Sequence, residues 1–149
     1  MTDRLAGKVA LITGGASGLG ANAANLMVQE GAKVMAVDRD LSSAEETAAM
    51  VKQSDGECVA FEADVTREAT LAAAVRAASE RWGRLDILHY NVGVSLAGGD
   101  ASPLEISEEA FDRICAINLR GCVMACKHAL PIMRAQRSGV IINISSVAA

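Results

Sequence analysis

The chain has 149 residues, a length that suits one domain and is marginal for two. Hydrophobic residues make up 51% and aromatic residues only 3%, so the core is expected to be aliphatic, as in helices layered on a buried parallel sheet. The net charge of −4 and the lack of a signal-peptide core or a membrane-length apolar run argue against nucleic acid or a membrane as partner and favour a cytoplasmic protein.

Short apolar runs alternate with longer amphipathic stretches along the chain. The apolar runs predict strands at Lys8–Thr13, Lys33–Val37, Glu57–Phe61, Asp86–Tyr90 and Val140–Ile144. The stretches between them predict helices over Gly18–Glu30, from Ser42 or Ser43 to about Ser54, over Thr66–Trp82, and over Ser107–Gln136 with a break near Gly121. The expected N-terminal caps are Ser42 or Ser43, Thr66 and Ser107, and Gly31 is the expected end of the first helix.

This alternation of strands and helices predicts an α/β fold. Right-handed crossovers then give a doubly wound parallel sheet of the Rossmann type, with strand order 3-2-1-4-5 and no internal domain boundary. Cys122, Cys126 and His128 lie close enough in sequence to suggest a metal site. They fall in an apolar helical stretch without a second ligand pair, so we expect packed free thiols and no metal.

The last helical region carries a regular pattern of charge. Basic residues recur at every seventh position, at Arg113, Arg120, Lys127 and Arg134, so they share one stripe of a helix. The other faces between Ile114 and Met133 are almost wholly apolar or small, which predicts burial on more than one side. One side can pack on the sheet, and the other requires a further helix or a partner subunit. Both possibilities remain open from the pattern, and a partner subunit would make the protein a homo-oligomer, a dimer or tetramer, built on this helix.

A glycine-rich turn joins the first strand to the first helix, with glycines at positions 14, 15, 18 and 20. Such a turn lets the backbone approach a pyrophosphate, and the helix N-terminus offers unpaired N–H groups and a positive dipole. Tight turns also need glycine for conformational reasons alone. The position of this turn between a strand and a helix favours phosphate binding over that simpler interpretation.

An acidic residue, Asp38, ends the second predicted strand. An acid at this place can accept both ribose hydroxyls of an adenosine and repels a 2′-phosphate, which favours NAD over NADP. The alternative is a solvated acid at a strand end. Arg39 is the next residue, and its guanidinium could bind a phosphate or stack on adenine.

Six motifs in register give the chain a family resemblance. They are Thr13–Gly20, Asp38, Asp64-Val65, Asn91-Val92-Gly93, Asn118–Gly121 and Asn143–Ser146. In this order and spacing they resemble the short-chain dehydrogenase/reductase family along the whole chain. The resemblance implies that residues 1–149 form a dinucleotide-binding Rossmann domain, which we expect to be incomplete at its C-terminal end, truncated after the fifth strand.

The resemblance also implies roles for individual residues. Those expected to bind the cofactor are Gly14, Ser17, Gly18, Leu19, Gly20, Asp38, Arg39, Asp64, Val65, Asn91 and Gly93. Asn118 and Ser146 match the asparagine and serine of the catalytic tetrad. On an ideal helix Asn118 lies about 140° from Arg113. We therefore expect a buried amide with hydrogen-bond partners, either in a proton relay through water or as a structural amide at the helix break.

Two features depart from the family pattern. The usual Asn-Asn-Ala-Gly after the fourth strand is Tyr90-Asn91-Val92-Gly93 here, and the preceding His89 is expected to be a packed strand residue rather than a catalyst. The family's Tyr-x-x-x-Lys pair, expected shortly after Ser146, is not among the 149 residues.

These observations predict an NAD-dependent oxidoreductase. In the intact protein it would transfer hydride between nicotinamide and a small-molecule alcohol or carbonyl. The alternative is a non-catalytic nucleotide-binding fragment or regulatory domain, because the 149 residues alone lack the acid/base pair and are expected to be inactive.

Overall fold

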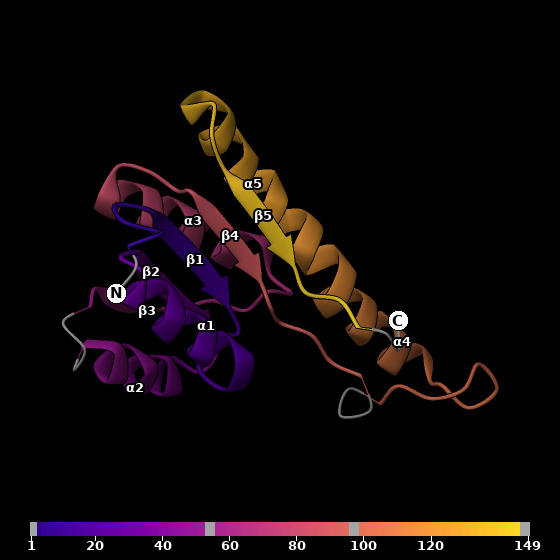
Figure 1. Cartoon of the computed structure of the whole chain (residues 1–149). Coiled ribbons are helices and arrows are strands. Elements are labelled where there is room, and N and C mark those ends of the chain that lie inside the picture. The colour runs from indigo at the N-terminus through magenta and orange to yellow at the C-terminus, as the bar shows by residue number, and fades with distance from the viewer. Residues whose placement is uncertain (1–2, 53–55, 96–98, 147–149) are drawn as a thin grey trace.

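Five parallel strands form the central sheet of the computed structural model, which describes residues 3–52, 56–95 and 99–146 (Figure 1). The strands are β1 (Val9–Thr13), β2 (Lys33–Asp38), β3 (Cys58–Glu62), β4 (Ile87–Tyr90) and β5 (Val140–Asn143). Their order is β3-β2-β1-β4-β5, and every neighbouring pair is parallel. The predicted doubly wound sheet and its strand order are confirmed.

The helical segments are α1 (Gly18–Gln29), α2 (Leu41–Lys52), α3 (Glu68–Trp82), α4 (Glu108–Cys115), the π-helical turn η2 (Ala116–Arg120) and α5 (Gly121–Gln136). The α1 and α2 helices pack on one face of the sheet, and α3 and α5 pack on the other. Within β1, Val9 and Leu11 face α3 and α5, whereas Ala10 and Ile12 face α1. Because both faces are covered, β1 is buried at every position and is apolar except at Thr13.

The predicted helix ends are correct at two places. Gly31 follows the last turn of α1 with φ +92°, a backbone conformation that favours glycine. Ser107 caps α4, because its Oγ accepts a hydrogen bond of 3.2 Å from the backbone N–H of Ala110.

The predicted serine cap of α2 is wrong. The carboxylate of Asp40 accepts both the backbone N–H of Ser43, at 3.1 Å, and its hydroxyl, at 2.7 Å, and the helix already begins at Leu41, before either predicted cap. The predicted end near Ser54 lies outside the described residues.

The predicted cap of α3 is also wrong. Asp64 Oδ1 accepts the backbone N–H of Thr66 at 2.9 Å and its hydroxyl at 2.7 Å, and α3 begins only at Glu68. In both helices an acid before the serine or threonine takes the hydroxyl that would otherwise cap the helix.

The predicted break in the last helical region is the wide turn η2. Two residues of the basic stripe reach the start of α3: Arg120 donates to the carbonyl of Thr66, just before the helix, and Lys127 Nζ lies 2.8 Å from Glu68 Oε1. On other sides of the same segment Leu119, Val123 and Leu130 remain exposed in the described structure. No helix within the described residues is both long enough and apolar enough to cross a membrane.

A buried carboxylate joins β1 to β4. Asp86 Oδ2 accepts the N–H of Val9 at 3.0 Å and Arg84 Nε at 2.7 Å, and only 3% of Asp86 is exposed. Burial on its own raises the pKa of Asp86, but the hydrogen bonds from Arg84 and Val9 outweigh it and hold the pKa below its usual value.

We expect Asp86→Asn to lower the free energy of unfolding at pH 7 by about 1–3 kcal/mol, because a buried acceptor of charged donors is weakened. The folded-state pKa is depressed, so this contribution is present above the unfolded pKa of about 4 and disappears as the pH falls through the folded value. Urea denaturation of both proteins at pH 7 and below pH 4 measures it. Asp112→Asn at an exposed position is the control and should change stability by less than about 0.5 kcal/mol.

Candidate functional site

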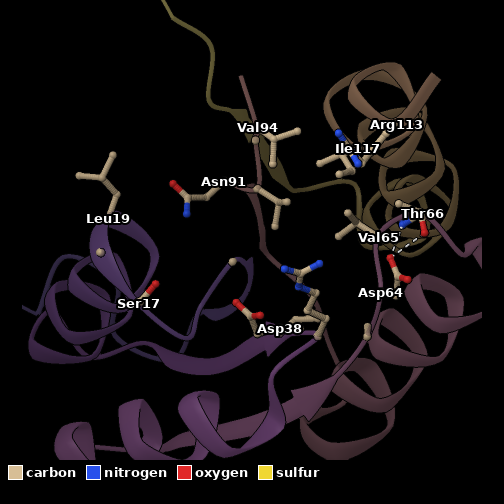
Figure 2. A pocket seen from close by; sticks show the side chains of 17 residues that line it. Ser17, Leu19, Asp38, Asp64, Val65, Thr66, Asn91, Val94, Arg113 and Ile117 are labelled. Carbon is tan, nitrogen blue, oxygen red and sulfur yellow. Dashed lines mark hydrogen bonds between the residues drawn. The ribbon is translucent and has the colours of Figure 1, made fainter. Parts of the chain in front are cut away.

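A cleft of about 760 Å³ lies at the carboxyl ends of the strands (Figure 2). In open α/β sheets this is where ligands bind, beside the point at which successive strands are added in opposite directions. Here that point falls between β1 and β4. The cleft is lined by Gly14, Ser17, Gly18, Leu19, Val37, Asp38, Arg39, Ala63, Asp64, Val65, Thr66, Asn91, Val92, Gly93, Val94, Arg113 and Ile117.

The loop between β1 and α1 forms one wall of the cleft. Gly14 has φ +69°, and a side chain at Gly20 would overlap the carbonyl oxygen of Gly14. The first turn of α1 therefore sits directly against the loop, which only glycine allows. Ser17 precedes α1 without forming a side-chain cap, and the first turn contains no acid. The helix thus presents uncapped N–H groups and its positive dipole at the cleft, as an anion site requires.

Neighbouring elements hold this loop in place. The N–H of Gly15 donates to the carbonyl of Val37 at 3.1 Å, and the N–H of Ala16 donates to Asp38 Oδ2 at 3.2 Å. From α2, Thr47 Oγ1 donates to the carbonyl of Ala16 at 3.2 Å. The loop between β1 and α1 is therefore held in place by β2 and α2.

Asp38 lies between the two walls of the cleft, with Ser17 and Leu19 on one side and Asp64, Val65 and Thr66 on the other (Figure 2). Besides the bond from Ala16, the Asp38 carboxylate accepts the N–H of Asp40 at 3.2 Å through Oδ1. Two backbone N–H groups thus fix the orientation of this carboxylate.

The opposite wall carries a second acid, Asp64. The hydrogen bond from the Thr66 side chain lowers the pKa of Asp64, against the opposing effect of partial burial, and the nearby charge of Arg39 lowers it further. Arg39 lines the cleft as well. Its guanidinium is therefore close enough to Asp64 to offset part of the negative charge of that carboxylate.

The segment after β4 forms the third side of the cleft. The N–H of Asn91 donates to the fully buried hydroxyl of Thr13 at 3.1 Å, which ties this segment to the end of β1. Further along, Asn118 makes a pair of hydrogen bonds with the backbone of Val94: its Oδ1 accepts the N–H at 2.8 Å, and its Nδ2 donates to the carbonyl at 2.7 Å.

The expectation that Asn118 is buried is wrong. The residue is exposed, although both ends of its amide are hydrogen-bonded. A helical wheel of 100° per residue does not apply through the wide turn η2, which contains Asn118.

The structure gathers ten of the eleven predicted cofactor residues around the one cleft. Gly20 is the exception: it is buried behind the loop, where it allows the close approach to Gly14. The two predicted catalytic residues do not line the cleft. Asn118 holds its edge at Val94, and Ser146 is exposed beyond the end of β5.

Sequence reasoning did not select the other lining residues, which are Val37, Ala63, Thr66, Val92, Val94, Arg113 and Ile117. Most of these are apolar, so their sequence pattern indicates core positions. Arg113 was assigned to the basic stripe, although its place one turn before Ile117 could have indicated a second lining residue on the same side of the helix.

His89 and the cysteines have structural surroundings. His89 is 7% exposed in β4, and burial lowers its pKa. His128 Nε2 lies 3.0 Å from Glu68 Oε1, and burial raises the pKa of Cys122. Over the described part of the chain, no three His, Cys, Asp or Glu side chains converge as metal ligands would.

Comparison with known proteins identifies the family to which this fold and cleft belong. The family model described as short chain dehydrogenase matches residues 8–149, nearly the whole chain. The chain belongs to the short-chain dehydrogenase/reductase family. The resemblance inferred from the six sequence motifs is thereby confirmed.

Among its relatives, levodione reductase of Leifsonia aquatica is 40% identical over 149 residues, covering 98% of this chain and 55% of that protein. The 2,5-dichloro-2,5-cyclohexadiene-1,4-diol dehydrogenase LinX of Sphingobium indicum is 40% identical over 147 residues, covering 99% and 58%. A crystal structure described as a short-chain dehydrogenase/reductase from Burkholderia xenovorans superposes with a TM-score of 0.90 at 38% identity, covering 97% of this chain and 58% of that one. The chain thus spans a little over half the length of these members of the family.

Proposed function

We propose that this chain is the nucleotide-binding part of an NAD(H)-dependent oxidoreductase acting on a small-molecule alcohol or carbonyl compound. The observation that carries the proposal is the composition of the cleft. It has the uncapped start of α1 on one wall and the carboxylate of Asp38, oriented by two backbone N–H groups, between its walls.

The residues present fit a dinucleotide. Gly20 lets the first turn of α1 lie directly against the carbonyl of Gly14, and the space around Gly18 is open, so a pyrophosphate can approach the N–H groups of α1. Asp38 would accept the ribose hydroxyls of the adenosine, and Asp64 and Val65 would border the adenine. Asn91 and Gly93 would line the far half of the molecule.

When bound, the nicotinamide ring donates or accepts the hydride. Ser146 would donate a hydrogen bond to the reacting oxygen of the substrate. Asn118 would fix the edge of the cleft and hold a water for proton transfer. The family's acid/base is a Tyr-x-x-x-Lys pair, which the 149 residues do not contain, so we propose turnover for a protein that also carries this pair.

We also propose a cytoplasmic protein that associates through the long helical segment. Leu119, Val123 and Leu130 are exposed in this segment, and Val140 and Ile142 of β5, the next element along the chain, are exposed as well. Exposed apolar side chains that gather on one surface mark interaction sites.

Binding and turnover are tested separately on the full-length protein. Calorimetric titration with NADH tests the site, and NADH production or consumption over a panel of alcohols and ketones tests the reaction. NADH binding together with turnover supports the proposal. NADH binding without turnover on any substrate favours the non-catalytic nucleotide-binding alternative, and no binding refutes both.

Replacing Asp38 by Asn should weaken NADH binding and relax discrimination against NADPH. A 2′-phosphate placed near an ionised carboxylate is repelled by about 4 kcal/mol at 4 Å for an effective dielectric constant of 20, and solvent screening reduces this. We therefore expect the ratio of the NADPH and NADH dissociation constants to fall by about 10–100-fold. Titration of both nucleotides into both proteins measures the ratio.

Asp40→Asn is the matched control, because it removes the same charge two residues away while asparagine still caps α2. The ratio should stay near that of the native protein. Tighter binding of NADPH than of NADH by the native protein would refute the charge argument and make Arg39 the dominant group.

A further inference from the structure

The last residue of β4 reaches the wide turn of the long helical segment. Tyr90 is 2% exposed, and its hydroxyl donates a hydrogen bond of 2.5 Å to the backbone carbonyl of Ile117, within η2. Tyr90 does not line the cleft, whereas Ile117 does. The phenol thus acts from inside the core on a turn whose outer side forms part of the site.

The turn is wide because it contains one residue more than an α-helix allows. The N–H of Gly121 donates to the carbonyl of Ala116, five residues back, in place of the usual four. Such turns disturb the regular ladder of backbone bonds, and a side-chain donor can satisfy a carbonyl there. The hydroxyl of Tyr90 is that donor for Ile117.

The fit depends on glycine at position 121. A Cβ there would overlap the hydroxyl of Tyr90 and come within 2.9 Å of the carbonyl oxygen of Val65. Tyr90 and Gly121 are therefore complementary: the bulky side chain that departs from the family's asparagine occupies space that a side chain at position 121 would need.

The same turn contains Asn118, whose amide binds the backbone of Val94 through two hydrogen bonds. The segment at the end of β4 thus contacts η2 twice, first through the side chain of Tyr90 and then, four residues later, through the backbone of Val94. Val94 and Ile117 both line the cleft. The rotation of η2 relative to β4 consequently sets both the place of Asn118 and the shape of this edge.

We propose that Tyr90 is a positioning residue: its hydrogen bond to Ile117 fixes η2 so that Asn118 holds Val94 and Ile117 at the edge of the cleft. Burial raises the pKa of the phenol far above neutrality, so the hydroxyl remains a donor throughout the working pH range. The effect on turnover rests on the proposed function, whereas the effect on the turn does not.

Tyr90→Phe in the full-length protein removes the hydroxyl and keeps the ring. We expect the Val94 N–H, followed by hydrogen exchange, to exchange about 5–10-fold faster, because the turn that holds its acceptor is loosened. Amides of β1 should keep their protection. We further expect kcat to fall about tenfold at nearly unchanged NADH affinity, since small displacements at a reacting site are costly.

Leu85→Val is the matched control, because Leu85 is fully buried in the same cluster but lies before β4, away from η2. It should lower the melting temperature without accelerating exchange at Val94. If Tyr90→Phe also leaves the exchange rate of the Val94 N–H unchanged, the proposal is overturned. The exchange measurement decides this even when the protein shows no turnover.

A double-mutant cycle with Asn118→Ala tests the route of the effect. Where Tyr90 acts through Asn118, Tyr90→Phe should change kcat by less than about twofold in the Asn118→Ala background. A full additional loss in the double variant would show that Tyr90 acts independently of Asn118, which overturns the proposal.

Discussion

Gly20→Ala is expected to reduce NADH affinity by about 100-fold and to destabilise the fold. The added Cβ would overlap the carbonyl oxygen of Gly14 and come within 2.9 Å of Asn91 Nδ2, so the loop and the first turn of α1 must separate. Overpacking of this kind costs about 1–3 kcal/mol of stability. The loss of two charge-assisted hydrogen bonds to a pyrophosphate, about 1.5 kcal/mol each, corresponds to roughly 100-fold in affinity.

Thermal unfolding and calorimetric titration with NADH separate the two effects. Gly83→Ala is the control, because Gly83 has φ +74° at the end of α3 with open space around it. It should cost about 1 kcal/mol of stability without changing NADH affinity. Native affinity in Gly20→Ala would show that the loop between β1 and α1 does not bind the pyrophosphate.

Ser146→Ala in the full-length protein should lower kcat by about 100-fold or more and leave the NADH dissociation constant within about twofold. The N–H of Ile144 donates to the carbonyl of Tyr90 at 3.0 Å, so the pairing of β5 with β4 leaves Ser146 on the side of the sheet where the strands end and the cleft lies. A hydroxyl there can donate to a substrate oxygen that gains negative charge in the transition state.

Ser145→Ala changes the neighbouring residue in the same way and should alter kcat by only a small factor. Steady-state kinetics at saturating NADH compares the two variants. A greater loss from Ser145→Ala than from Ser146→Ala would reverse the assignment that the family pattern suggests.

The sheet could be predicted from sequence because it depends on patterns that parallel sheets impose. Buried strands are apolar along their whole length, and crossovers have one hand, so runs such as Val9–Thr13 define both the strands and their order. The strand bounds differ from the prediction by a residue or so; β5, for example, ends at Asn143 rather than Ile144.

The helix starts were less predictable, since they depend on competition between nearby polar groups. Ser43 and Thr66 are good caps by residue type, but Asp40 and Asp64 take their hydroxyls. A sequence shows both the acid and the hydroxyl, yet it does not show which of them the backbone turns toward.

The glycine loop and Asp38 could be selected from their positions after the first two strands, whereas Asp64 and Asn91 were selected through the family resemblance. The apolar lining could not be selected, since Val94 and Ile117 resemble any core residue until the strand ends are assembled. The departure at Tyr90 was visible in the sequence, but its partner was not: the carbonyl of Ile117 becomes available only in the wide turn.

The order of the strands also bears on when the cleft forms during folding. Residues of β1, β2 and β3 are close in sequence, whereas β4 reaches β1 from far along the chain, as the bond between Val9 and Asp86, 77 residues apart, shows. Closing so long a loop is slow, so the half of the sheet that carries Asp38 can assemble before the half that carries Asn91. Neither half contains all the residues that line the cleft. Any nucleotide that binds therefore selects the fully assembled sheet, and its binding energy stabilises the whole domain rather than one loop.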